Sequence, residues 1–144
     1  MNPHFVEILK AFRDQAVEYL LIGAYALAAH GHVRATLDID LWVKPTPDNA
    51  CRTWRALQRF RAPLSKMNVE DFSEPDVLYQ IGLAPSRIDI MTSVTGLEFD
   101  AAWPNRILAT FGEVAVPVLG LDDMRTAKRA AGRLKDLADL EELG

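Results

Sequence analysis

The chain has 144 residues, 49% hydrophobic and 25% charged, with a formal net charge of −4. This composition fits one globular domain spanning residues 1–144 and gives no general electrostatic attraction to nucleic acid. The only cysteine, Cys51, excludes an intrachain disulfide and a cysteine-based metal site. A single cysteine fits a reducing cytoplasm, where we expect the protein. We expect no membrane segment, because the longest apolar run, Tyr19–Ala29, is far shorter than the ~20 residues that span a bilayer.

The N-terminal half predicts helices and strands in alternation. Apolar residues recur at helical spacing from Phe5 onward, Gly23 interrupts a buried apolar run, and Thr46-Pro47 is typical of a helix N-cap and first turn. The expected elements are, in chain order, a helix from Pro3, a strand at 18–22, a helix at 24–30, a strand at 38–44 and a helix from Pro47.

The C-terminal half predicts more strands and a helical end. Proline, serine and asparagine residues make 62–76 a loop with at most one helical turn. The expected elements that follow are strands at 77–83 and 87–92, a helical turn at 99–103, strands at 107–111 and 114–119, and the C-terminal helices within 121–143, interrupted at Gly132.

Acidic residues mark the same side of two of these strands. Alternation places Asp38, Asp40 and Trp42 on one face of their strand, and apolar Ile39 and Leu41 on the other. Two neighbouring anions repel each other, and a shared divalent cation with oxygen ligands, Mg²⁺ above all, relieves that repulsion. The alternative is an exposed sheet face with two solvated aspartates.

A third carboxylate recurs in a later strand. Asp89 lies on the polar side of the strand at 87–92, together with Arg87 and Met91, while Ile88 and Ile90 face the other way. We expect Asp38, Asp40 and Asp89 to converge at one end of a cleft.

Basic residues offer further candidate contacts. Lys128 falls on the apolar stripe of its helix, so its ammonium needs solvent or an anion, and the aspartate cluster is a candidate anion. The cluster of Lys135, Asp136 and Asp139 reads equally well as surface salt bridges of little weight. A stripe of arginines follows Pro47, and either a solvated face or an RNA-phosphate contact explains it: Arg52, Arg55 and Arg59.

The order of these features resembles the nucleotidyltransferase superfamily, which has the polymerase-beta-like fold. The resemblance rests on Gly23-Ala24 after a strand, on Arg34-x-Thr36-x-Asp38-x-Asp40, on the later Asp89, and on the segment Lys128–Asp136. It covers roughly residues 18–140, and the chain is most similar to small stand-alone bacterial nucleotidyltransferases related to abortive-infection toxins. The resemblance implies an α/β (α+β) fold, a mixed sheet flanked by helices.

The resemblance also implies an activity and a site. The activity is Mg²⁺-dependent transfer of a nucleoside monophosphate from an NTP to an acceptor hydroxyl on RNA, a protein or a small molecule. Catalysis and metal binding fall to Asp38, Asp40 and Asp89, with two Mg²⁺ ions, or Mn²⁺ in their place, and with Asp89 as a candidate base. The residues implied in nucleotide binding are Gly23, Ala24, Arg34, Thr36 and Lys128. For Arg34, a loop-bracing ion pair is an equal alternative.

Two other functions stay open. Ala24 stands where the superfamily often has serine or glycine, and the chain lacks the second domain of larger relatives. Both features favour a weak or inactive binding partner in a toxin–antitoxin-like pair. A metal-dependent phosphohydrolase would use the same carboxylates.

Overall fold

The computed structural model describes residues 1–33, 38–83 and 86–144. Its centre is a six-stranded mixed sheet with strand order β3-β4-β2-β1-β6-β5. The strands are β1 (Tyr19–Ile22), β2 (Ile39–Val43), β3 (Leu78–Ile81), β4 (Ile88–Met91), β5 (Ile107–Phe111) and β6 (Val114–Val118). The α/β class with a mixed sheet, expected from the sequence, is confirmed.

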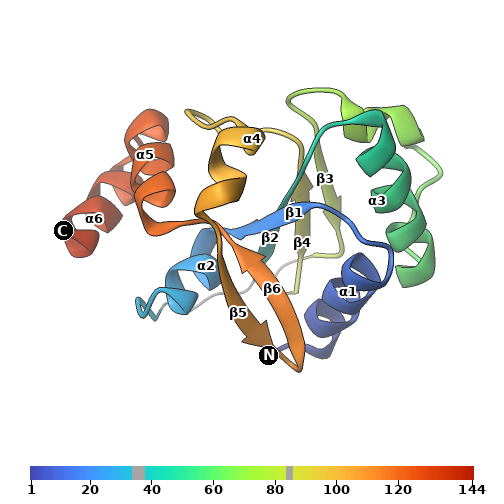
Figure 1. Ribbon diagram of the computed structural model, residues 1–144, viewed down its shortest axis with the longest axis horizontal. Helices are drawn as coiled ribbons and strands as arrows, with labels where there is room; N and C mark the ends of the chain where they lie inside the picture. Colours follow the sequence, from blue (N-terminus) through green and yellow to red (C-terminus); the bar gives the residue numbers. More distant parts are fainter. Residues whose placement is uncertain (34–37, 84–85) are drawn as a thin grey trace.

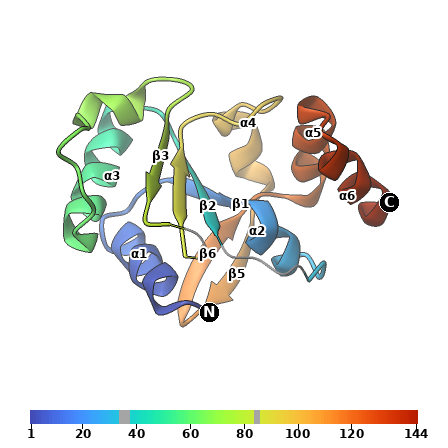
Figure 2. The same cartoon turned by 180° about the vertical axis from the view of Figure 1, so that it is seen from behind.

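Helices cover both faces of this sheet. They are α1 (Pro3–Asp14), α2 (Gly23–Ala29), α3 (Pro47–Phe60), α4 (Phe99–Ala102), α5 (Leu121–Ala131) and α6 (Leu134–Leu143), with short 3₁₀ helices at Val69–Ser73 and Trp103–Asn105. Figures 1 and 2 show α1 and α3 on one side of the sheet and α2, α5 and α6 on the other. None of the helices in the described part of the chain combines the length and the apolar character needed to cross a bilayer.

The middle of the sheet is built from segments far apart in the sequence. β2 lies between β1, with which it is antiparallel, and β4, with which it is parallel. The register places Asp40 opposite Ile22 on one side and opposite Asp89 on the other. The beginning of β2, the beginning of β4 and the end of β1 therefore meet at one edge of the sheet.

Apolar packing covers part of the β2 face that carries Asp40 and leaves the end near Asp38 accessible. Ile39, Leu41 and Val43 are fully buried on one face of β2. Trp42 lies on the same face of β2 as Asp40, but it is 1% exposed and belongs to the core, as expected for this residue. Its ring packs edge-on against Phe99 of α4 at 5.2 Å between centroids. Because α4 covers the Trp42 half, only the Asp38–Asp40 end of this face remains accessible.

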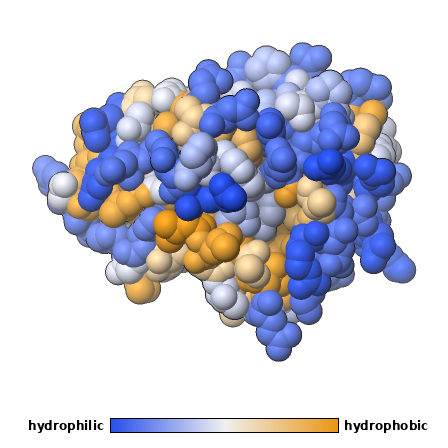
Figure 3. Space-filling model, viewed as in Figure 1, coloured by the Kyte–Doolittle hydropathy of each residue, from blue (hydrophilic) through white to orange (hydrophobic). Residues whose placement is uncertain are grey.

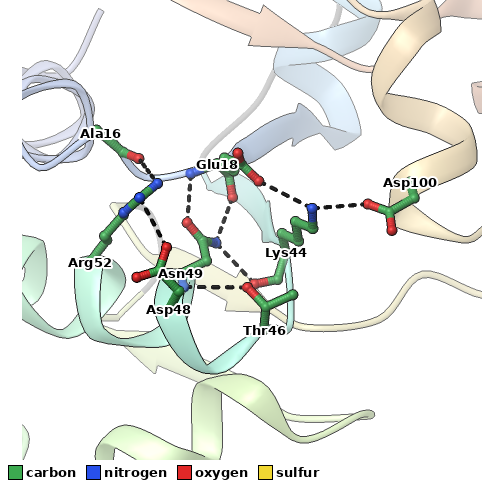
Figure 4. A network of polar contacts seen from close by, with 8 residues as sticks. All are labelled: Ala16, Glu18, Lys44, Thr46, Asp48, Asn49, Arg52 and Asp100. Atoms are coloured by element: carbon green, nitrogen blue, oxygen red, sulfur yellow. Dashed lines mark hydrogen bonds and ion pairs between the residues drawn. The ribbon is translucent and has the colours of Figure 1, made fainter.

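A polar network fixes α3 to the opposite ends of β1 and β2 (Figure 4). Asn49, 2% exposed, accepts a hydrogen bond from the Glu18 amide at 2.8 Å and donates to the carbonyls of Glu18 and Lys44, each at 2.9 Å. At the same end, Lys44 forms ion pairs with Glu18 and Asp100. The end of β2 remote from Asp40 is thus tied to α3 and β1 by hydrogen bonds.

The surface seen in Figure 3 is mostly polar, with an apolar patch near its centre where Figure 1 shows β5 beside α2. β5 is an edge strand and pairs with β6. Its Leu108 is 70% exposed and its Ile107 37% exposed. Ile107 and Leu108 therefore lie on the edge strand at the opposite side of the sheet from β3.

Candidate functional site

The sheet register brings the three predicted carboxylates together. Asp40 and Asp89 are direct neighbours on the parallel strands β2 and β4, and their side chains lie within hydrogen-bonding reach of each other. Asp38 directly precedes β2, and its Oδ1 accepts a hydrogen bond from the backbone amide of Arg87 at 3.2 Å. The convergence that the alternation of the two strands predicted is therefore present.

Gly23 makes room for this cluster. β1 ends at Ile22, opposite Asp40, and the chain turns into α2 with a φ of 73° at Gly23. This left-handed conformation favours a residue without a Cβ. A Cβ at Gly23 would lie 2.2 Å from Oδ2 of Asp40, which is far inside van der Waals contact. The backbone turn and the Asp40 carboxylate can be this close only because residue 23 is glycine.

Among the described residues, Arg87 brings a positive charge into contact with the carboxylates. Its Nε donates to Oδ1 of Asp89 at 2.8 Å and its Nη2 to Oδ2 at 3.2 Å, a two-point contact that fixes the guanidinium plane. The same Nη2 lies 3.3 Å from Oδ2 of Asp38. One arginine thus bridges two of the three carboxylates.

Even with Arg87 nearby, the charged form of Asp40 is disfavoured. Burial, together with the neighbouring carboxylates of Asp89 and Asp38, raises its pKa to about 6, while Arg87 acts in the opposite direction. A carboxyl group whose pKa is raised in this way favours a proton or another cation close by. Burial and the neighbouring carboxylates thus outweigh the effect of Arg87 on Asp40.

The cluster lies in a cleft of about 830 Å³. One wall contains the carboxylates, Gly23 and Ala24, and the other is formed by α5 and α6. Charged side chains line this second wall: Lys128, Arg133, Lys135, Asp136 and Asp139. The cleft thus has an acidic wall at the sheet edge and a wall of mixed charge opposite it.

Lys128 lines the cleft as expected, but its anion is a different one. Its Nζ lies 2.8 Å from Oδ2 of Asp139 and 3.9 Å from Oδ1 of Asp136, both on α6. The expectation that the sheet-edge aspartates hold Lys128 in the empty protein is therefore wrong. The physical reason is that α6 folds back along α5 and brings its own carboxylates closer.

The α6 carboxylates are also more than a surface cluster. Asp136 is only 2% exposed, and it pairs with Arg133 at 2.6 Å rather than with Lys135. The Arg133 guanidinium holds the pKa of Asp136 below its usual range. The interpretation of this group as solvated salt bridges of little weight is wrong for Asp136.

The remaining predicted contacts have different outcomes. Arg34 and Thr36 lie outside the described residues. Arg52 of the α3 stripe pairs with Asp48 at 2.9 Å and contacts the Ala16 carbonyl, which fits a structural role (Figure 4).

Three residues of the site, Arg87, Asp136 and Asp139, were not assigned to it from the sequence, and only Arg87 carried a signal that could place it there. Arg87 was recognised on the same face as Asp89, and its i, i+2 position was enough to place it in the carboxylate row. Asp136 and Asp139 required the fold of α6 onto α5, which residue spacing does not encode.

The donor chemistry of the cluster fits a divalent cation. Three carboxylates supply the oxygen ligands that Mg²⁺ and Mn²⁺ prefer, and a nearby cation would lower the pKa of Asp40, which burial and the other two carboxylates raise. Within residues 1–33, 38–83 and 86–144, no three acidic, histidine or cysteine side chains are already set around one metal position. A cation would therefore require a rearrangement at Arg87, Asp38 or Asp89.

Comparison with known proteins supports the fold. No family model and no curated protein matches the sequence. The structure is similar to that of a candidate nucleotidyltransferase (TM1012) from Thermotoga maritima, with a TM-score of 0.66. The two share 16% sequence identity, over 99% of this chain and 93% of the other. The nucleotidyltransferase-like fold expected from the sequence is thereby confirmed.

Proposed function

We propose that this protein is a divalent-cation-dependent nucleotidyltransferase, which moves a nucleoside monophosphate from an NTP to an acceptor hydroxyl. The observation that carries the proposal is the meeting of Asp38, Asp40 and Asp89 beside the Gly23 turn, in a cleft large enough for a nucleotide. The fold shared with a candidate nucleotidyltransferase supports the same reading.

In this proposal Asp38, Asp40 and Asp89 hold Mg²⁺, or Mn²⁺, through their carboxylate oxygens. A divalent cation bound there neutralises charge on the triphosphate and polarises the phosphoryl oxygen. No protein nucleophile is needed, because positioning and charge stabilisation supply most of the catalysis in phosphoryl transfer.

The chain's own residues then have separate tasks. Gly23 allows the backbone to approach the phosphates closely, since no Cβ projects from it. Lys128, on the opposite wall, supplies a cation for the triphosphate when it exchanges Asp139 for a phosphate oxygen. We assign the proton of the acceptor hydroxyl to Asp89.

The proposed reaction is a single displacement at the α-phosphorus. A bond forms between the acceptor oxygen and the α-phosphorus, and the bond from that phosphorus to the oxygen bridging to the β-phosphate breaks. Pyrophosphate leaves, and the acceptor proton passes to Asp89.

The test uses each of the four NTPs, labelled at the α-phosphate, with Mg²⁺ and cell extract. The wild type should leave label on RNA, protein or a small molecule. Asp40→Asn should abolish this transfer, and Asp48→Asn, which alters an exposed carboxylate of α3, should retain it. Release of labelled nucleoside monophosphate without transfer would instead indicate a phosphohydrolase.

One observation favours a second candidate, a nucleotide-binding partner without turnover. Ala24 lines the cleft beside Gly23 and has no hydroxyl to bond a phosphate. An inactive member of a toxin–antitoxin-like pair would bind NTP and leave label on nothing. Ala24→Ser would then increase NTP affinity without creating transfer.

A further inference from the structure

Arg87 shares the acidic row of the sheet edge as a consequence of strand geometry. Residues two apart in an extended chain point to the same side, so Arg87, which directly precedes β4, lies beside Asp89 of that strand. The carbonyl of Arg87 accepts a hydrogen bond from the amide of Ile39 at 3.0 Å, which aligns the residue with the start of β2. The position of its backbone therefore directs its guanidinium along the row of carboxylates.

The guanidinium occupies the oxygens that a cation would use. Both oxygens of Asp89 accept hydrogen bonds from it, and Asp89 is only 6% exposed. The third contact reaches Oδ2 of Asp38. A divalent cation needs several oxygens at about 2.1 Å, and a guanidinium on the same oxygens opposes it by charge and by space.

The Arg87 side chain also has room to move away from the carboxylates. Its side chain is 33% exposed and lines the same cleft as Lys128 and Arg133. An arginine has a long flexible stem, so its head can leave the carboxylates while its backbone stays in place beside the start of β4.

We propose that Arg87 is the resident counter-ion of the empty site, which gives up Asp38 and Asp89 to an incoming divalent cation and turns into the cleft. The proposal deepens the proposed function and rests on it. Arg87 thereby stabilises the empty protein and sets a threshold for cation binding. It is a positioning residue, because it acts through the carboxylates.

The test compares wild type with Arg87→Gln, which removes the charge and keeps a polar side chain. Arg52→Gln is the matched control, because it breaks an arginine–aspartate pair on α3, away from the cleft. Mn²⁺ binding is measured by calorimetric titration at pH 7.5 and constant ionic strength, and melting temperatures are recorded in EDTA and in Mn²⁺.

Arg87→Gln should bind Mn²⁺ at least about fivefold more tightly than wild type and melt at a lower temperature in EDTA. Mn²⁺ should raise its melting temperature by more than it raises that of wild type. Arg52→Gln should match wild type in both Mn²⁺ affinity and Mn²⁺-induced shift. Arg87→Lys should bind Mn²⁺ with intermediate affinity, because it keeps the charge and loses the two-point contact.

Two results would overturn the inference in distinguishable ways. Mn²⁺ affinity in Arg87→Gln that is equal to or weaker than in wild type would show that Arg87 does not compete with the cation, while the proposed function stands. Absence of Mn²⁺ binding in both proteins would remove the metal site itself, and the proposed function with it.

Discussion

At the scale of single residues, the site depends on Asp40, whose surroundings disfavour the charged form of its carboxyl group. Burial and two neighbouring carboxylates raise its pKa to about 6, above the ~3.9 of an unfolded chain. A carboxyl whose pKa is raised on folding stabilises the fold at low pH, and this contribution is lost as the pH rises through the folded value. The difference corresponds to about 3 kcal/mol at neutral pH.

Asp40→Asn should therefore stabilise the cation-free protein in a pH-dependent way. At pH 7.5 its free energy of unfolding should exceed that of wild type by up to about 3 kcal/mol, and near pH 4 the two should be nearly equal. Denaturant unfolding in EDTA at several pH values measures this, with Asp48→Asn as the control at an exposed site. A difference that stays constant from pH 4 to 7.5 would refute the explanation.

Gly23 is the second residue on which the site depends. Gly23→Ala combines a positive φ with a Cβ 2.2 Å from the Asp40 carboxylate, so we expect a loss of about 2–4 kcal/mol in unfolding free energy and loss of Mn²⁺ binding. Gly31→Ala isolates the backbone cost, because Gly31 has a φ of 90° and nothing within 4 Å of an added Cβ. It should lose about 1–2 kcal/mol and bind Mn²⁺ normally. Equal effects of the two substitutions would argue against the close packing of Gly23 on Asp40.

At the scale of elements, α5 and α6 form the cleft wall that faces the sheet edge. Lys128 and Asp139 pair across the two helices with side chains 15% and 18% exposed. Removing one partner of a pair with so little exposure lowers the stability of the protein, because the remaining charge is poorly solvated. Lys128 thus contributes to the stability of the wall as well as to the charge of the cleft.

Lys128→Ala should weaken NTP-Mg²⁺ binding by roughly 1.5–3 kcal/mol, the range of a charge-assisted hydrogen bond. It should also lower the unfolding free energy by about 1–3 kcal/mol, more than its place on a helix alone suggests. Lys128→Met keeps the stem and removes the charge. Asp139→Asn breaks the same pair but leaves Lys128 charged, so it should lose stability and keep NTP affinity. Equal NTP affinities in wild type and both Lys128 variants by calorimetric titration would assign Lys128 a structural role alone.

At the scale of the whole molecule, the sequence predicts elements better than it predicts their neighbours. The strand at 38–44 and the strand at 87–92 could be read from alternation, and their shared acidic side followed from it. That β2 and β4 are adjacent and parallel, with Asp40 beside Asp89, is a long-range pairing that local patterns do not specify. The packing of Trp42 against Phe99 is likewise a long-range contact, since α4 comes from a distant segment.

The rigidity of this arrangement is expected to depend on the far end of the sheet. Asn49→Ala removes three hydrogen bonds to the backbone of Glu18 and Lys44, so we expect a loss of about 2–4 kcal/mol in unfolding free energy. Arg52→Ala, which breaks the more exposed pair with Asp48, should cost at most about 1 kcal/mol. Denaturant unfolding compares the two variants. A small effect of Asn49→Ala would show that α3 is held by apolar packing alone.

The central claim, that the carboxylates of β2 and β4 bind a nucleotide through a divalent cation, is tested most directly by crystallography. Crystals would be grown with Mn²⁺ and an NTP analogue with a carbon bridge between the α- and β-phosphates, and Mn²⁺ located by anomalous scattering. The account predicts Mn²⁺ within about 2.0–2.2 Å of oxygens of Asp38, Asp40 and Asp89, with the triphosphate between them and Lys128. Nucleotide or Mn²⁺ bound elsewhere, with these carboxylates still held by Arg87, would contradict it.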